Sequence, residues 1–284
     1  MTINWKRTTA TALAVTGLMM GAAGGAKAAP VDLELSLVID VSGSVDQSEY
    51  ELQRDGWAAA FNDSTVQSAI TSLASDGGGV AVNALYFGTT ADAPTYGVQI
   101  DWQLLTDSSS ASSFATDLSN MDEPLTGGGG TGNTNIADGI NLALSEIASN
   151  QYEGDRMVID VSGDGDQNVL LDGTQGTLSN EEDDLATQVS AAASAGVVIN
   201  GLAIGNADTD PDSPSLLSYY QSNVITSGGF AIGTNFTSEF EDAATRKLQA
   251  EITGETPVPE PATLGLFGIG LAGIGFAARR RRSC

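Results

Sequence analysis

The segment that decides the fold is Leu33–Ser44, which reads LELSLVIDVSGS. Its first nine residues form an apolar run with two polar interruptions near the start, a pattern typical of a β-strand buried on both faces. Asp40, Ser42 and Ser44 come at the end of this run, so a carboxylate and two hydroxyls should meet at the carboxyl end of the strand. Oxygen ligands of this kind suit Mg²⁺, with Mn²⁺ and Ca²⁺ as alternatives.

Helices and strands alternate beyond this first strand. A capped amphipathic helix begins at Asp46 and places Tyr50, Trp57 and Phe61 on one face. The residue pattern predicts further strands at 80–87, 98–105, 157–161, 197–204 and 230–232, and helices at 112–121, 136–147, 181–195, 215–222 and 236–252. A short, turn-rich segment joins strands 80–87 and 98–105, which indicates an antiparallel pair at one edge. The remaining alternation predicts an α/β fold with a mostly parallel sheet and helices on both faces.

The spacing of Asp40, Ser42 and Ser44 resembles the metal-ion-dependent adhesion site (MIDAS) of von Willebrand A domains. The resemblance includes the context, because the motif follows a buried strand and precedes a capped helix. It implies a Rossmann-like von Willebrand A fold with a sheet of about six strands, one of them an antiparallel edge strand. In that family a threonine from a loop before a helix adds a ligand. Thr134 takes this place in the glycine-rich segment 127–140, and Thr131 is the alternative.

The same resemblance implies an aspartate after the fourth strand. Asp164, followed by glycine, fits this position. Asp160 is its rival, because residues 157–167 repeat residues 37–47 at eight of eleven positions. By the resemblance, the hydroxyls bind the ion directly, the carboxylates bind it directly or through water, and a partner's Asp or Glu completes the site. Residues 32–252 further resemble one uncharacterised bacterial branch of the superfamily, which has no assigned activity.

The N-terminus has the three parts of a secretory signal. Lys6 and Arg7 precede an apolar stretch at 10–23, and Ala26 and Ala28 frame a small-residue cleavage site. We expect signal peptidase to cut after Ala28. The predicted organisation is therefore a signal peptide at 1–28, a von Willebrand A-like domain at 29–253 and a sorting segment at 254–284.

The C-terminal segment has a second targeting pattern. Pro259, Glu260 and Pro261 precede an uncharged run at 262–278, which just reaches the length of a membrane-spanning helix. The run is followed by Arg279, Arg280, Arg281 and Arg282, which favour a cytoplasmic tail. This order resembles the PEP-CTERM sorting signal of Gram-negative bacteria. It implies an inner-membrane intermediate, cleavage by an exosortase, and delivery to the cell surface or extracellular matrix. A permanent single-pass anchor is the alternative.

Composition excludes several classes of function. The chain has no histidine, and its one cysteine is Cys284, so the common general base, the usual zinc sites and disulfides within the domain are absent. All 36 acidic residues lie at 32–260, against four basic residues in the same range. Such a charge repels nucleic acid and attracts cations.

These patterns favour a metal-dependent adhesion protein of the envelope or biofilm matrix, binding a protein or exopolysaccharide that presents a carboxylate. A metal-dependent hydrolase or phosphotransferase with Asp40 as nucleophile is the alternative. The absence of histidine, and of lysine near the motif, weighs against it. A third hypothesis is a passive matrix protein that keeps the fold without binding metal.

Overall fold

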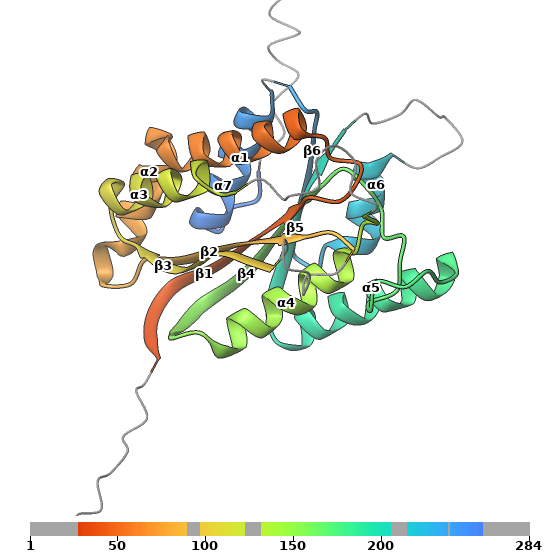
Figure 1. The fold of residues 1–284 in the computed structure, drawn as a ribbon. Coiled ribbons are helices and arrows are strands. Elements are labelled where there is room, and N and C mark those ends of the chain that lie inside the picture. Colours follow the sequence, from red (N-terminus) through yellow and green to blue (C-terminus); the bar gives the residue numbers. More distant parts are fainter. Residues whose placement is uncertain (1–27, 90–96, 123–131, 206–214, 238, 258–284) are drawn as a thin grey trace, which may run out of the picture.

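The computed structural model describes residues 28–89, 97–122, 132–205, 215–237 and 239–257, arranged around one central sheet (Figure 1). The strand order is β3-β2-β1-β4-β5-β6. β3 runs antiparallel to β2, and the other neighbouring pairs are parallel, which confirms the predicted sheet. The strands are β1 (Ala29–Asp40), β2 (Val80–Phe87), β3 (Gly97–Leu105), β4 (Tyr152–Gly163), β5 (Val197–Ile204) and β6 (Ala231–Thr234).

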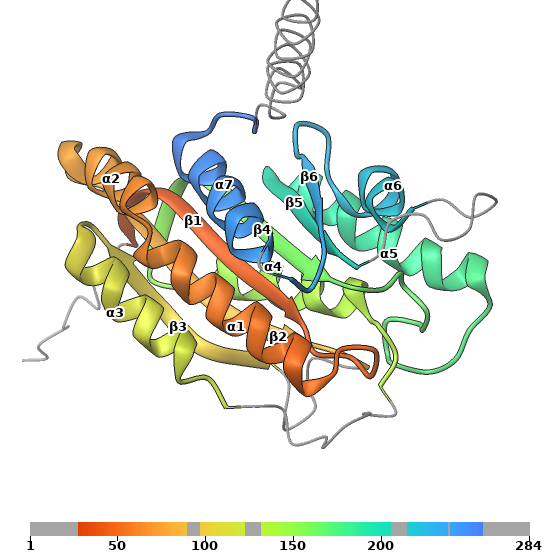
Figure 2. The same cartoon turned by 90° about the horizontal axis from the view of Figure 1, so that it is seen from above.

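Helices cover both faces of the sheet (Figures 1 and 2). One face carries α1 (Gln47–Asn62), α2 (Ser64–Leu73), α3 (Ser108–Ser119) and α7 (Glu239–Thr253). The other carries α4 (Ile136–Ser149), α5 (Leu178–Ser194) and the short α6 (Leu216–Tyr219), which continues into a π-helical turn at Tyr220–Val224. A 3₁₀ turn at Ala74–Asp76 follows α2.

Several elements differ from the sequence-based expectation: α2 was not predicted, β4 begins earlier than expected, and β1 and α3 each begin four residues early. The pattern analysis missed α2, although Val66, Ile70 and Leu73 recur at helical spacing along its ten residues. A second signal is the cap at Asp63, whose carboxylate accepts bonds from two backbone amides. β4 begins at Tyr152, five residues before the predicted strand, because this partly exposed stretch pairs with the start of β1.

The first strand is buried from both sides, as its apolar run predicts. Leu37 and Ile39 pack into the core beneath α1 and α7, whereas Val38 packs into the core beneath α4 and α5. Each fully buried side chain of this type contributes roughly 1.5–3 kcal/mol of transfer free energy. The double burial fixes the position of β1, and with it the side chains at its carboxyl end.

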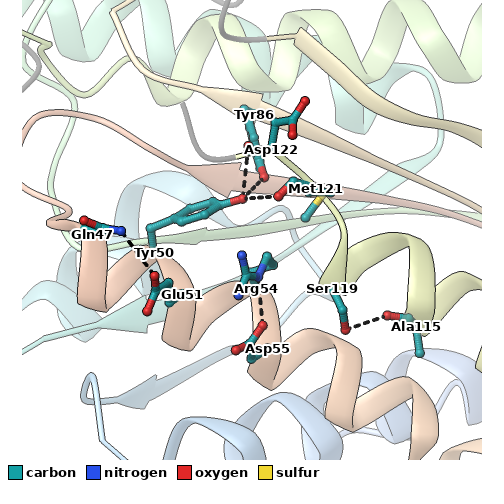
Figure 3. Close-up of polar contacts among 10 residues, drawn as sticks. All are labelled: Gln47, Tyr50, Glu51, Arg54, Asp55, Tyr86, Ala115, Ser119, Met121 and Asp122. Carbon is teal, nitrogen blue, oxygen red and sulfur yellow. Dashed lines mark hydrogen bonds and ion pairs between the residues drawn. The ribbon is translucent and has the colours of Figure 1, made fainter. Parts of the chain in front are cut away.

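Polar contacts anchor the helix that leaves the predicted motif. The Tyr50 hydroxyl on α1 lies 2.6 Å from that of Tyr86 on β2, and 3.1 Å from the carbonyls of Met121 and Asp122 after α3 (Figure 3). These buried contacts join α1 to the sheet and to the end of α3. The start of α1 is therefore held in place next to the carboxyl end of β1.

The predicted membrane-spanning segment at 262–278 lies outside the described residues. Within the described part of the chain, no helix is both long and apolar enough to cross a bilayer. The signal segment at 1–27 likewise lies outside this part.

Candidate metal centre

Four of the five candidate ligands lie at or just after the ends of two neighbouring strands, and the fifth, Thr134, lies just before α4. β1 and β4 are adjacent and parallel, yet the chain continues from β1 toward β2 on one side and from β4 toward β5 on the other. A crevice at such a reversal is where α/β sheets bind their ligands. Asp40 ends β1 and Asp164 follows β4 directly, so both carboxylates stand at this reversal.

The structure brings the five oxygen-bearing side chains together. The Ser42 hydroxyl lies 3.2 Å from that of Ser44 and 3.2 Å from that of Thr134. Ser44 donates a 2.6 Å hydrogen bond to Asp164. Adjacent ligand oxygens around an octahedral Mg²⁺ are about 3 Å apart, because each lies 2.0–2.1 Å from the ion. The observed separations are close to this spacing.

Asp40 forms the floor of the group. Its Oδ1 accepts a 2.8 Å bond from the Ser42 amide, while Oδ2 is buried without a hydrogen-bond partner. A buried carboxylate oxygen without a donor costs free energy. A cation would satisfy it, so this atom fits a metal centre.

Two glycines leave space at the centre that a side chain would otherwise fill. A Cβ added at Gly163 would lie 2.7 Å from Asp40 Oδ2, and one added at Gly165 would lie 2.9 Å from the Thr134 hydroxyl. Either side chain would press on a candidate ligand. Asp164 therefore stands between two residues whose lack of a side chain leaves room for an ion.

Electrostatics also favour a bound cation. Burial raises the pKa of Asp40 to about 7, and the nearby Asp164 adds to the rise. Burial raises the pKa of Asp164 as well. The two carboxylates thus repel each other in a poorly solvated place. Among the described residues, no three His, Cys, Asp or Glu side chains cluster around a common point, so the Ser and Thr hydroxyls must complete any ligand set.

The chain resembles known proteins both in its domain and in its C-terminal segment. Residues 30–256 match the family described as "Protein of unknown function (DUF1194)". The chain belongs to this family. Residues 257–282 match the PEP-CTERM protein-sorting motif, as the sequence analysis predicted. No curated protein matches the sequence.

Solved structures confirm the von Willebrand A fold for this DUF1194 chain. The von Willebrand factor domain of the type V pilus tip protein Mfa5 from Porphyromonas gingivalis superposes with a TM-score of 0.51 at 10% identity, covering 81% of this chain and 98% of that one. The pilus adhesin SpaC from Lactobacillus rhamnosus GG gives 0.53 at 14% identity, covering 80% and 31%. Proximal thread matrix protein 1 from the mussel byssus, with zinc in its MIDAS motif, gives 0.50 at 12% identity, covering 80% and 50%. The chain therefore spans half or less of the length of two of these proteins.

The two alternative ligands named from the sequence have different outcomes. Thr131 lies outside the described residues. Asp160 lies within β4, where it forms a fully buried ion pair with Lys247 of α7 at 2.6 Å. Since Asp164 is the aspartate that contacts Ser44, we retain Asp164 in the proposed ligand set.

Sequence reasoning missed the residues that hold Thr134. Asn168 accepts a 2.9 Å bond from the Thr134 amide and donates its own amide to the Thr134 carbonyl at 3.1 Å. Gln167 bonds the side chain of Asn135, which caps α4, and accepts a bond from the amide of Ala137. The loop after β4 is therefore joined both to Thr134 itself and to the first residues of α4. The only sequence signal was the run Asp166-Gln167-Asn168, which reads as an ordinary polar loop.

Proposed function

We propose that this chain is an exported binding protein that holds a divalent cation, most simply Mg²⁺, and uses it to bind a carboxylate of a protein or polysaccharide partner. Mn²⁺ and Ca²⁺ are alternative ions. The observation that carries the proposal is the buried, unpartnered Oδ2 of Asp40 beneath three convergent hydroxyls. A structural turn alone would leave that oxygen unsatisfied.

The proposed ligands have separate roles. Ser42, Ser44 and Thr134 would contribute neutral oxygens, so they would leave most of the ion's positive charge uncompensated. Asp40 and Asp164 would balance part of it, directly or through water. Ser42 and Thr134 are buried whereas Ser44 is exposed, so the centre opens to solvent on the Ser44 side. When bound, the ion supplies a positive centre to which a partner's carboxylate can bind.

The sorting motif supports a location outside the cytoplasm. We propose that signal peptidase removes 1–28, and β1 begins at Ala29, directly after that point. We further propose that an exosortase cuts near Pro259, Glu260 and Pro261 after transient membrane insertion, and that the product reaches the surface or matrix of a Gram-negative cell. The match at 257–282 supports this route. The acidic composition disfavours nucleic acid as a partner.

Retention on a carboxylated polysaccharide tests this function. The purified protein is passed over immobilised polyuronate in Mg²⁺, and then in excess chelator. We expect retention in Mg²⁺ that is lost with the chelator and lost in Asp40→Asn. Asp166→Asn is the matched control, because Asp166 is an exposed acid two residues from Asp164. It should behave as wild type.

Two results would count against this function. Retention that persists in the chelator, or that Asp40→Asn leaves intact, would show that the interaction does not use the centre. Hydrolysis of a phosphate ester that disappears in Asp40→Asn would instead support the metal-dependent hydrolase. Because the chain contains no histidine, such an enzyme would need another general base.

A further inference from the structure

A second group of charged side chains lies deep beneath α7, apart from the proposed metal centre. Lys247 Nζ is 2.6 Å from Asp160 Oδ1 and 2.5 Å from Glu251 Oε1. The side chains of all three residues are fully buried. Lys247 and Glu251 are one helical turn apart on α7, and Asp160 faces them from β4. A single amine is thus held against two carboxyl groups away from water.

This arrangement is an expensive way to form an ion pair. Removing one ammonium and two carboxylates from water costs several kcal/mol per ion, which good hydrogen bonds must offset. Here they do so only in part: Glu251 Oε1 accepts hydrogen bonds from Lys247 and Asn200, but Glu251 Oε2 and both oxygens of Asp160 have no hydrogen bond of normal geometry. The Lys247 amine therefore approaches the Asp160 carboxyl group from outside the direction of a hydrogen bond.

We propose that Lys247 and Asp160 join covalently, through an amide bond between Lys247 Nζ and the side-chain carbonyl carbon of Asp160. Glu251 acts as the proton carrier. It takes a proton from the Lys247 ammonium and delivers it to Asp160, which leaves a neutral amine beside a neutral carboxylic acid. The nitrogen attacks the carbonyl carbon, the C–OH bond breaks, and the hydroxyl departs with a second proton from nitrogen as one water molecule. Glu251 ends as the carboxylate, so no oxidant or other reactant is needed.

The geometry and the surroundings favour each part of this step. Lys247 Nζ lies 2.6 Å from Asp160 Oδ1, and the carbonyl carbon is one covalent bond from that oxygen, so the nitrogen is held beside the atom that it would attack. Burial, followed by the charge of Glu251, raises the pKa of Asp160 well above its ordinary value, and this favours the acid form that can lose hydroxide. Asn200 donates a 2.9 Å bond to Glu251 Oε1 and so holds the proton carrier in position.

The product removes the electrostatic cost. An amide replaces one positive and one negative buried charge, and its N–H would stay beside Glu251 Oε1, where Lys247 Nζ now lies. The new bond would join α7 to β4, across most of the second half of the domain. Such a staple suits an exported domain whose chain has Cys284 as its one cysteine and so cannot form an internal disulfide. This inference does not depend on the metal centre.

Peptide mass spectrometry of the full chain tests the bond. Trypsin cuts after Arg156 and Arg246, which releases residues 157–246 as one peptide because this stretch contains no other Lys or Arg. We expect this peptide to remain attached to the peptide that begins at Lys247, with the joint mass lower than the sum by one water. Trypsin should also fail to cut after the acylated Lys247.

Matched variants separate the bond from simple proximity. Glu251→Gln keeps both reacting groups, and Lys247→Arg keeps the positive charge, yet each should release the two peptides separately. Gln249→Ala alters an exposed position of α7 and should give the linked pair. The wild-type digest decides the question even if a variant fails to fold. If wild type yields only the free peptide 157–246, with cleavage after Lys247, the proposal is wrong and the group is an ion pair.

Discussion

This domain has two groups of acidic side chains: the proposed metal centre at Asp40, and the buried group formed by Asp160, Lys247 and Glu251. Asp40 and Asp160 lie in copies of the same local sequence but have different surroundings. Asp40 and Asp160 each occupy the fourth position of the repeated stretch at 37–47 and 157–167. Asp40 ends its strand beside hydroxyls that lead to solvent. Asp160 lies inside its strand and faces a buried lysine. The difference shows that a motif gains its chemistry from where the sheet places it.

Strand register is the physical cause of the difference. β1 and β4 pair so that Leu37 is opposite Asp160 and Ile39 is opposite Ser162. The two copies of the motif are therefore offset by three residues along the sheet. Because side chains alternate between faces, an odd offset turns the second aspartate to the opposite face. Asp160 thus points to the α7 side, three positions below the edge where Asp40 lies.

The largest expected effect on stability comes from replacing Lys247 in the buried group that it forms with Asp160 and Glu251. Lys247→Met would prevent the proposed amide bond and would also leave Asp160 and Glu251 buried without a basic partner. Removing one partner of a buried ion pair typically costs about 3–5 kcal/mol. Chemical unfolding should show a loss of this size, whereas Gln249→Met on the exposed side of α7 should change little. A loss near zero for Lys247→Met would contradict the claim that this buried group stabilises the domain.

A smaller effect, on metal affinity, is expected when the proposed metal centre loses one hydroxyl. Thr134→Val keeps the shape of the side chain but removes the oxygen that lies 3.2 Å from Ser42. We expect Mn²⁺ affinity, measured by titration calorimetry, to fall by roughly 10–100-fold, the range seen when groups around a metal site are changed. Thr134→Ser should retain most of the affinity. Equal losses in both variants would indicate a structural role for Thr134.

Neutralising a charged residue should change stability in opposite directions at the two sites. Lys247→Met should lower the free energy of unfolding, whereas Asp40→Asn should raise it when no ion is bound. Asp40→Asn removes a carboxylate whose burial raises its pKa to about 7, so the charged form opposes folding when no ion is bound. At pH 8 in chelator we expect a gain in the free energy of unfolding on the order of a few kcal/mol, since each pKa unit between 3.8 and about 7 corresponds to about 1.4 kcal/mol. The measurement is chemical unfolding beside wild type. A clear loss would mean that the charge of Asp40 already has a stabilising partner.

The last expected effect is a pH dependence of the stability of the metal-free protein. The pKa of Asp40 is higher in the folded state than its ordinary value of 3.8, so the folded state binds more protons between about pH 4 and pH 7. The contribution of Asp40 to stability is therefore full below about pH 4 and is lost as the pH rises through 7. Unfolding curves in chelator should show wild type losing more stability than Asp40→Asn across this window. A parallel decline would contradict the assignment to Asp40.

Local patterns predicted the sheet, most helices and the grouping of Asp40, Ser42 and Ser44. The apolar run ending at Asp40 is enough to place these side chains at a strand end. The same reasoning left Asp160 and Asp164 as rivals, because both lie in one repeated segment and only the pairing register separates them. Nor could it find Lys247 beside Asp160, since contacts between residues 87 positions apart leave no local pattern. The hydrogen bonds between Asn168 and Thr134 could not be predicted for the same reason, because these residues are also far apart in the sequence.

The central claim is that the proposed metal centre, which includes Asp40 and Ser42, holds a divalent cation. Direct calorimetric titration with Mg²⁺ and Mn²⁺ tests this claim best. Wild type and Asp166→Asn should each bind one ion. Asp40→Asn and Ser42→Ala should lose measurable binding while circular dichroism shows an intact fold. Binding of equal strength in wild type, Asp40→Asn and Ser42→Ala would contradict the claim, as would no binding to wild type.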